Sequence, residues 1–170
     1  MFKLLSSIGY NVRVVLLNSA HYGTAQARER VVFLGRRGKD FAVKAPEIRD
    51  DKKRFRDMRS EYDEGDILSP ASLARLERAD GKGFELIGGH DRVNTLTTGV
   101  SSSGRKMLVT QDTDGTWRRL TCLEGERLQG FPEAWTEGSS KSDRWFALGN
   151  AVCCNVSRYL FNDYLKGLWW

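Results

Sequence analysis

The chain has 170 residues, of which 40% are apolar and 11% aromatic, and its net charge is +5. This length predicts one ordinary domain or two small ones, and the apolar content excludes a disordered tail. No apolar run reaches the roughly 18 residues of a transmembrane helix, and the N-terminal apolar stretch is too short for a signal peptide. The three cysteines include an adjacent pair and cannot form a disulfide framework, so we expect a reducing cytoplasm.

Positive charge is concentrated between residues 36 and 59. This segment holds ten basic and five acidic side chains, so it accounts for the whole net charge of +5. A basic block indicates a polyanionic partner, and nucleic acid is the commonest one. The alternative is a solvated helix with opposite charges four residues apart. Charge alone favours neither.

The N-terminal part predicts a short helix followed by two strands. Residues 2–9 are amphipathic and end on a glycine, as helices often do. The apolar, β-branched runs 12–17 and 31–34 predict two strands joined by a long polar loop. Continuous apolar runs are typical of strands covered on both faces. Two such strands alone would leave a sheet edge and apolar surface exposed.

The middle of the chain predicts little regular structure. Residues 36–68 are charged and lack apolar periodicity, whereas 69–77 predict a short helix with a serine cap and Pro70 at its first position. The Gly-, Ser- and Thr-rich stretch that follows contains short β pieces, which are typical of an irregular β domain that presents loops. These pieces are expected at 84–87, 93–96 and 107–110.

Two helices are predicted near the C-terminus. Thr121 and Glu124 form a capping box that begins a helix ending at Gln129, and Gly130 stops it. After a polar turn, a final helix is expected over 151–165, because its apolar residues recur every fourth position.

Three segments carry most of the functional information. They are Gln26-Ala27-Arg28-Glu29-Arg30, then Arg118-Arg119-Leu120-Thr121 continuing through Glu124 to Arg127-Leu128-Gln129-Gly130-Phe131-Pro132, and finally Gly149-Asn150-Ala151-Val152. In this order they resemble the three C-terminal blocks of the DNA cytosine C5-methyltransferase family. The variable stretch between the first two is where that family places its target-recognition domain. The resemblance covers essentially the whole chain, with Ala25 and Cys122 standing where the family usually has proline.

The resemblance implies an α/β fold. The chain would supply late strands and the C-terminal helix of a Rossmann-like, S-adenosylmethionine-dependent methyltransferase sheet, with an inserted small, irregular, β-rich target-recognition domain. The implied divisions are 1–36 for a catalytic-domain piece, 37–117 for the recognition domain, and 118–170 for the return to the catalytic domain.

The first segment resembles the family's base pocket. By that resemblance, Arg30 would reach the O2 side of a flipped cytosine, Arg28 would order the site, and Gln26 would fix the loop. The residues Arg28, Arg30 and Val32 alternate along a strand, so they should project from one face. The structural alternative is that the two arginines form salt bridges at a strand end.

The third segment resembles the cofactor side of the family's active site. Asn150, Ala151 and Val152 would contact S-adenosylmethionine, and a helix beginning there would offer free N–H groups to a carboxylate. A plain Asn N-cap is a compatible alternative. Only two histidines are present and no metal-ligand cluster stands out, so no metal is expected.

Double-stranded DNA is the expected partner of the middle segment. Thr95 and Leu96 resemble a Thr-Leu dipeptide of the family's recognition domains, which implies a hydroxyl contact to the DNA backbone. Other side chains are candidates to contact DNA from neighbouring loops, and ordinary surface charge is a strong alternative for each of them. These are Lys82, His90, Arg92, Arg105 and Lys106.

Several family motifs are missing from these 170 residues. They contain no Gly-rich cofactor loop placed after a strand, no Pro-Cys nucleophile and no Glu-Asn-Val acid. The sequence therefore predicts a larger methyltransferase subunit that carries these motifs, in a prokaryotic or phage-encoded split enzyme for restriction–modification or DNA protection. The alternatives are a non-catalytic DNA-binding or regulatory protein derived from such an enzyme, and an inactive remnant.

Overall fold

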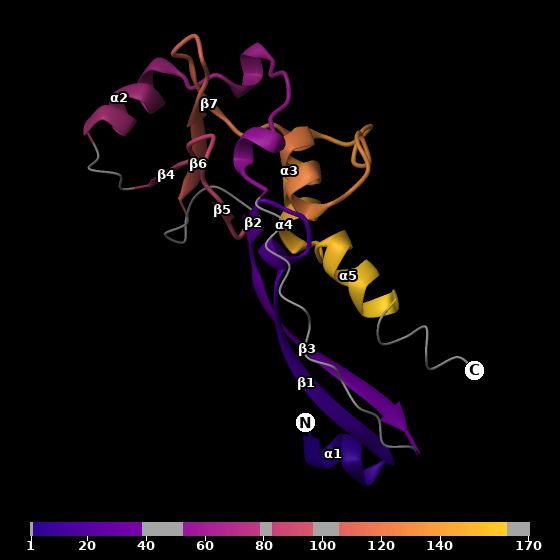
Figure 1. Cartoon of the computed structure of the whole chain (residues 1–170). Coiled ribbons are helices and arrows are strands. Elements are labelled where there is room, and N and C mark those ends of the chain that lie inside the picture. Colours follow the sequence, from indigo (N-terminus) through magenta and orange to yellow (C-terminus); the bar gives the residue numbers. More distant parts are fainter. Residues whose placement is uncertain (1, 39–52, 79–82, 97–105, 163–170) are drawn as a thin grey trace.

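The computed structural model describes residues 2–38, 53–78, 83–96 and 106–162 (Figure 1). Its fold is mixed α/β with three small sheets. In chain order the elements are α1 (Phe2–Ser7), β1 (Tyr10–Asn18), η1 (Ser19–His21), β2 (Gln26–Ala27), β3 (Glu29–Arg37), η2 (Phe55–Asp57), η3 (Glu64–Asp66), α2 (Pro70–Arg78), β4 (Phe84–Leu86), β5 (Val93–Asn94), β6 (Met107–Gln111), β7 (Trp117–Arg119), α3 (Cys122–Gln129), α4 (Lys141–Asn150) and α5 (Cys154–Leu160).

The strands β1 and β3 form a long antiparallel ladder that extends away from the rest of the molecule, with α1 at its far end (Figure 1). Its nine pairs run from Tyr10↔Arg37 to Asn18↔Glu29. Both predicted strands are therefore confirmed, and each is longer than its apolar run. The predicted N-terminal helix is also confirmed, and Gly9 follows it with a φ of 87°, a conformation that favours glycine.

The two faces of this ladder differ in burial. On one face, Leu17 packs with Cys153 and Val156 of the α5 segment, joined by Val15, Tyr22, Val32 and Leu160. The opposite face is apolar and open. Its members, which we call the open face, are Val14, Leu16, Val31 and Phe33, between 44% and 61% exposed.

A second sheet connects the N-terminal part to the middle of the chain. The strand β2 pairs in parallel with β5, with Gln26 opposite Val93. The third sheet has the order β4-β6-β7, and Leu76 of α2 packs against its apolar cluster. The three predicted β pieces and the helix that begins with Pro70 are thus confirmed.

The largest apolar cluster draws on all three predicted divisions of the chain. Ala25 comes from the first, and Leu120 and Leu128 come from the third. The middle division supplies Phe55, Met58, Ile87, Val93 and Leu96. The described segments therefore share a core, which fixes the middle division, residues 37–117, against the two flanking divisions.

The final predicted helix begins too early, and a helix before it was not predicted. The helix α4 ends at Asn150, Ala151 follows in an extended conformation, and α5 begins only at Cys154. The missed signal is Ser140, whose side chain accepts a hydrogen bond from the Asp143 N–H at 3.2 Å and so caps α4. Residues 163–165 of the prediction lie outside the described residues.

The capping box of α3 is confirmed. The Thr121 hydroxyl accepts from the Glu124 N–H at 3.1 Å, and the Glu124 carboxylate accepts from the Thr121 N–H at 2.8 Å. Gly130 ends the helix with a φ of 72°. Cys122, where the family usually has proline, is the first residue of α3, a position that either residue suits.

Candidate functional site

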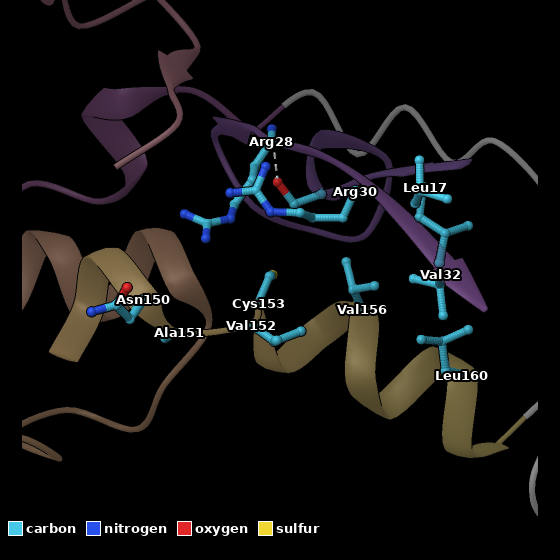
Figure 2. Close-up of a pocket in the computed structure, with 12 residues that line it drawn as sticks. Leu17, Arg28, Arg30, Val32, Asn150, Ala151, Val152, Cys153, Val156 and Leu160 are labelled. Carbon is cyan, nitrogen blue, oxygen red and sulfur yellow. Dashed lines mark hydrogen bonds between the residues drawn. The ribbon is translucent and has the colours of Figure 1, made fainter. Parts of the chain in front are cut away.

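A cleft of about 220 Å³ lies between the β1–β3 ladder and the junction of α4 and α5 (Figure 2). Residues predicted for two different roles meet there: the arginines of the first segment and the Asn-Ala-Val triplet of the third. One end of the cleft is cationic and the other is apolar. The lining residues are Leu17, Ser19, Arg28, Arg30, Val31, Val32, Asn150, Ala151, Val152, Cys153, Val156 and Leu160.

Arg28 connects three parts of the chain at this cleft. Its guanidinium donates through Nη1 to the Leu96 carbonyl at 3.0 Å and through Nη2 to the Gly149 carbonyl at 3.2 Å. Its backbone N–H donates to Ser19 Oγ at 3.1 Å. The side chain is only 7% exposed, so these bonds form away from bulk water. Arg28 therefore ties the segment around Leu96 and the α4–α5 junction to the Gln-x-Arg-x-Arg loop.

The acceptors that the structure describes for the Arg28 guanidinium are neutral backbone carbonyls, those of Leu96 and Gly149. Burial, together with the neighbouring positive charge of Arg30, lowers the pKa of Arg28 from its ordinary value. Within the described residues neither arginine forms a salt bridge to a carboxylate, so the alternative of paired strand-end arginines is not seen there. A buried cation that lacks an anionic partner is well suited to meet negative charge brought by a ligand.

Arg30 lies at the same cleft but is exposed. Its guanidinium donates to the carbonyl of Glu29 at 2.6 Å, and its backbone pairs with Leu17 across the ladder. Because Arg28, Arg30 and Val32 all line the cleft, the prediction that they project to one face is confirmed.

Gln26 is fully buried and fixes the loop through its backbone. Its carbonyl accepts from Ser19 Oγ at 2.6 Å, and its N–H donates to Thr24 Oγ1 at 3.0 Å. Both polar atoms of its side-chain amide lack a partner in the described part of the chain, as do Arg28 Nε and Gln129 Oε1. An unsatisfied buried polar group costs roughly 1–3 kcal/mol and is characteristic of sites where function constrains the residue.

The third segment lines the cleft in a different way from that expected. Val152 is 62% exposed, and the Asn150 amide donates to the Phe146 carbonyl at 3.1 Å, inside the last turn of α4. The expectation that Asn150, Ala151 and Val152 begin a helix is wrong, because Asn150 ends α4 and the other two residues lie between α4 and α5. These residues therefore do not offer free helix N–H groups. Ala151 and Val152 instead contribute an apolar wall, and Asn150 contributes an exposed amide.

The predicted DNA-contacting residues divide by burial. Leu96 is 1% exposed and belongs to the core, so its contribution at the site is the carbonyl that accepts from Arg28, while Thr95 is half-buried. His90 and Lys106 are exposed and Arg92 is half-buried. Lys82 and Arg105 lie outside the described residues.

Two buried acidic groups of α3, Glu124 and Glu126, form ion pairs that were not predicted from the sequence, where Glu124 was expected only to cap the helix. Arg118 donates to both oxygens of Glu124, at 2.9 Å and 2.8 Å, and both residues are fully buried. Arg118 also pairs with Asp112 and lies 5.0 Å from the centre of the Tyr62 ring. Glu126, equally buried, pairs with Arg144 at 3.0 Å and accepts from Thr136. The sequence signal was the Arg-x-Leu-Thr…Glu pattern, which places a cation three residues before the Thr cap.

Solved structures that are similar to this chain identify its fold. The fold is that of the DNA methyltransferases: the Dnmt2 methyltransferase of S. pombe matches with a TM-score of 0.79 at 20% identity, over 99% of this chain and 60% of that one. A putative DNA modification methyltransferase encoded within an E. coli prophage matches with a TM-score of 0.68 at 17% identity, over 98% of this chain and 63% of the other.

The C-5 cytosine-specific DNA methylase family model matches residues 1–166, so this chain belongs to that family. Type II methyltransferase M.NlaX of Neisseria lactamica is 28% identical over 164 residues, which are 91% of this chain and 52% of the relative. Type II methyltransferase M.Sau3AI of Staphylococcus aureus is 39% identical over 72 residues, 42% of this chain and 17% of the relative. The chain thus spans about half of the length of M.NlaX. Among the described residues, no helix is long and apolar enough to cross a membrane.

Proposed function

We propose that this chain is the DNA-recognition subunit of a two-chain DNA (cytosine-5-)-methyltransferase. Its partner is a larger chain that carries the Gly-rich cofactor loop, the Pro-Cys nucleophile and the Glu-Asn-Val acid. The observation that supports this most is Arg28, which hydrogen-bonds both the recognition segment at Leu96 and the α4–α5 junction at Gly149. A protein that only bound DNA would not need a buried arginine joining these segments beside a cleft.

The chemistry assigns a clear task to each half. Cytosine C5 becomes nucleophilic only after a thiolate has added to C6, with an acid assisting at N3. The partner supplies both of those groups. This chain supplies Arg30 to the O2 side of the flipped base, where a guanidinium stabilises the negative charge that develops, and Arg28 to position that end of the cleft.

The residues of the third segment fit one side of the cofactor. The apolar wall with exposed Val152 and the solvent-exposed amide of Asn150 suit a ligand that has both apolar and polar parts. When bound, S-adenosylmethionine supplies the methyl group that is transferred. Asn150, Ala151 and Val152 would hold it against the cleft, and the partner's Gly-rich loop would complete the site.

The open face of the ladder supports an attached partner. Leu16 is 61% exposed and pairs with Val31, which is 55% exposed, and Val14 lies opposite Phe33 in the same way. Apolar pairs of this kind on a two-stranded sheet expose hydrophobic surface that a monomer normally buries. We propose that apolar side chains of the partner pack against this face and remove it from water.

The test is the transfer of labelled methyl groups from S-adenosylmethionine to DNA by this chain, by the partner, and by the two together. We expect activity only in the mixture, and a loss of roughly 100-fold or more with Arg30→Ala, because a donor to developing charge is removed. The matched control is Arg78→Ala at the exposed end of α2, outside the cleft, which should leave the rate unchanged.

The same assay separates the alternatives. If a bound partner carrying Pro-Cys gives no transfer, while this chain still binds DNA, the non-catalytic DNA-binding or regulatory function replaces the proposed one. Activity from this chain alone would show that the nucleophile lies within it and would overturn the two-chain proposal.

A further inference from the structure

A tight glycine turn and the short helix η2 form a rigid unit at the surface of the recognition segment. Phe55 N–H donates to the Asp91 carbonyl at 3.0 Å, and Arg56 N–H donates to the Gly89 carbonyl at 2.8 Å. The turn is closed by the Gly88 N–H, which donates to Asp91 Oδ2 at 2.7 Å. A Cβ at Gly88 would lie 3.0 Å from that carboxylate oxygen, so a larger residue there would push the Asp91 side chain aside by a few tenths of an ångström.

This unit is anchored to the core on both sides. Phe55 is fully buried at the start of η2, and Ile87 and Val93 are buried on either side of the turn, all in the same cluster. Side chains carried on the unit are therefore presented at fixed positions, and preorganised groups of this kind lose little entropy when they bind.

Two exposed side chains project from the unit as a pair. The Arg56 guanidinium lies 3.2 Å from His90 Nδ1 through its Nη1 atom. Arginine has only donors, so Nδ1 accepts, and the proton of the neutral imidazole is on Nε2. The pair thus presents the remaining guanidinium N–H groups and the His90 Nε2–H, which are all donors. The Arg56 side chain is 57% exposed and free to meet a ligand.

We infer that the Arg56–His90 pair reads a guanine in the major groove of the DNA target. The major-groove edge of guanine offers two acceptors, O6 and N7, and a bidentate arginine is its commonest partner. A backbone phosphate offers acceptors too. It is less well matched here, because the Asp57 carboxylate lies 3.9 Å from Arg56 Nε and opposes a second anion. This inference rests on the proposed function, since it takes DNA to be the substrate.

The glycine turn of this unit is also close in sequence to the residues that contact the cleft segment. The turn leads directly into β5, whose Val93 N–H donates to the Ala25 carbonyl at 2.8 Å. Three residues later the Leu96 carbonyl accepts from Arg28. The segment that carries His90 therefore also carries the carbonyl that positions Arg28, so that recognition and the base pocket share one stretch of chain.

The experiment selects sequences from a randomised duplex library with the full chain and its partner, at two salt concentrations. Wild type should enrich a motif with a guanine at one fixed position. In Arg56→Lys, which keeps the charge but loses the bidentate geometry, the preference for that guanine should fall about tenfold or more, with little change in overall affinity. The variant Arg119→Lys, at the exposed last residue of β7, is the matched control and should keep the motif.

A second arm identifies the acceptor. In wild type, 7-deazaguanine at the selected position should reproduce the loss, because it removes N7, and it should add little to the loss in Arg56→Lys. Circular dichroism verifies that the variants fold alike. If Arg56→Lys keeps the full preference, or if Arg56→Gln weakens all sequences equally and reduces the salt dependence, Arg56 contacts phosphate and the inference is overturned. If wild type with its partner binds no duplex, the proposed function itself fails.

Discussion

Buried charge is concentrated around α3, where Arg118, Glu124 and Glu126 are all fully buried. Burial on its own would lower the pKa of Arg118, but the hydrogen bonds that its guanidinium donates to the carboxylates of Glu124 and Asp112 outweigh burial and raise this pKa. Glu124 also caps α3 through the Thr121 N–H. One carboxylate therefore holds both a helix start and a buried cation, and it fixes the strand β7 against the helix that follows.

We predict that Glu124→Gln lowers the free energy of unfolding by about 3 kcal/mol, because it leaves much of the buried Arg118 charge without a partner. Urea unfolding followed by circular dichroism measures the change. The control is Glu133→Gln, which breaks the ion pair of Arg127 with a 66% exposed carboxylate and should cost at most about 0.5 kcal/mol. Equal losses in the two variants would contradict this account.

The surroundings of Glu126 lead us to predict that the free energy of unfolding depends on pH. Burial on its own would raise its pKa, but hydrogen bonds from Thr136 and the ion pair with Arg144 outweigh burial and lower the pKa below its ordinary value of 4.5. Its stabilising contribution is therefore fully present above pH 4.5 and is lost as the pH falls below that value. Wild type should have a higher free energy of unfolding than Glu126→Gln at neutral pH, and the difference between the two should become smaller in acid. A gap in unfolding free energy that stays constant down to about pH 3 would contradict this.

At the scale of elements, the sequence predicted well wherever local signals acted alone. The strands 12–17 and 31–34, the helix at Pro70 and the Thr121 capping box all form as expected. The α4–α5 break was missed because the spacing of Val152, Val156 and Leu160 continues the helical period through residues that the chain holds extended. The hydrogen bonds of Arg28 to carbonyls 68 and 121 residues away leave no local pattern, so the sequence could suggest its role only through resemblance.

The two faces of the β1–β3 ladder predict opposite effects for neighbouring residues. Leu16→Lys, on the open face, should change the unfolding free energy of the isolated chain by less than about 0.5 kcal/mol and abolish association with the partner. Leu17→Lys, at a position 2% exposed, should unfold the chain or cost at least about 3 kcal/mol. Urea unfolding and sedimentation of the mixture measure both. Association that survives Leu16→Lys and a second open-face change, Val14→Lys, would show that the partner docks elsewhere.

At the scale of the whole molecule, we propose that this chain holds the recognition segment, the arginine end of the cleft and one wall of the cofactor site. The recognition segment is joined to the cleft by the shared apolar core and by Arg28. Under this proposal the nucleophile belongs to the partner. We therefore predict that both chains are needed for the reaction. Only the partner should form the covalent bond to cytosine C6.

The most direct measurement is covalent trapping on duplex DNA that contains 5-fluorocytosine. Fluorine at C5 cannot leave as a proton does, so the thiolate that has added to C6 stays bonded to the base. We predict an adduct on the partner polypeptide, formed only when this chain and S-adenosylmethionine are both present, and strongly reduced by Arg30→Ala. An adduct on any of Cys122, Cys153 or Cys154, or an adduct on the partner that forms equally well without this chain, would contradict the account.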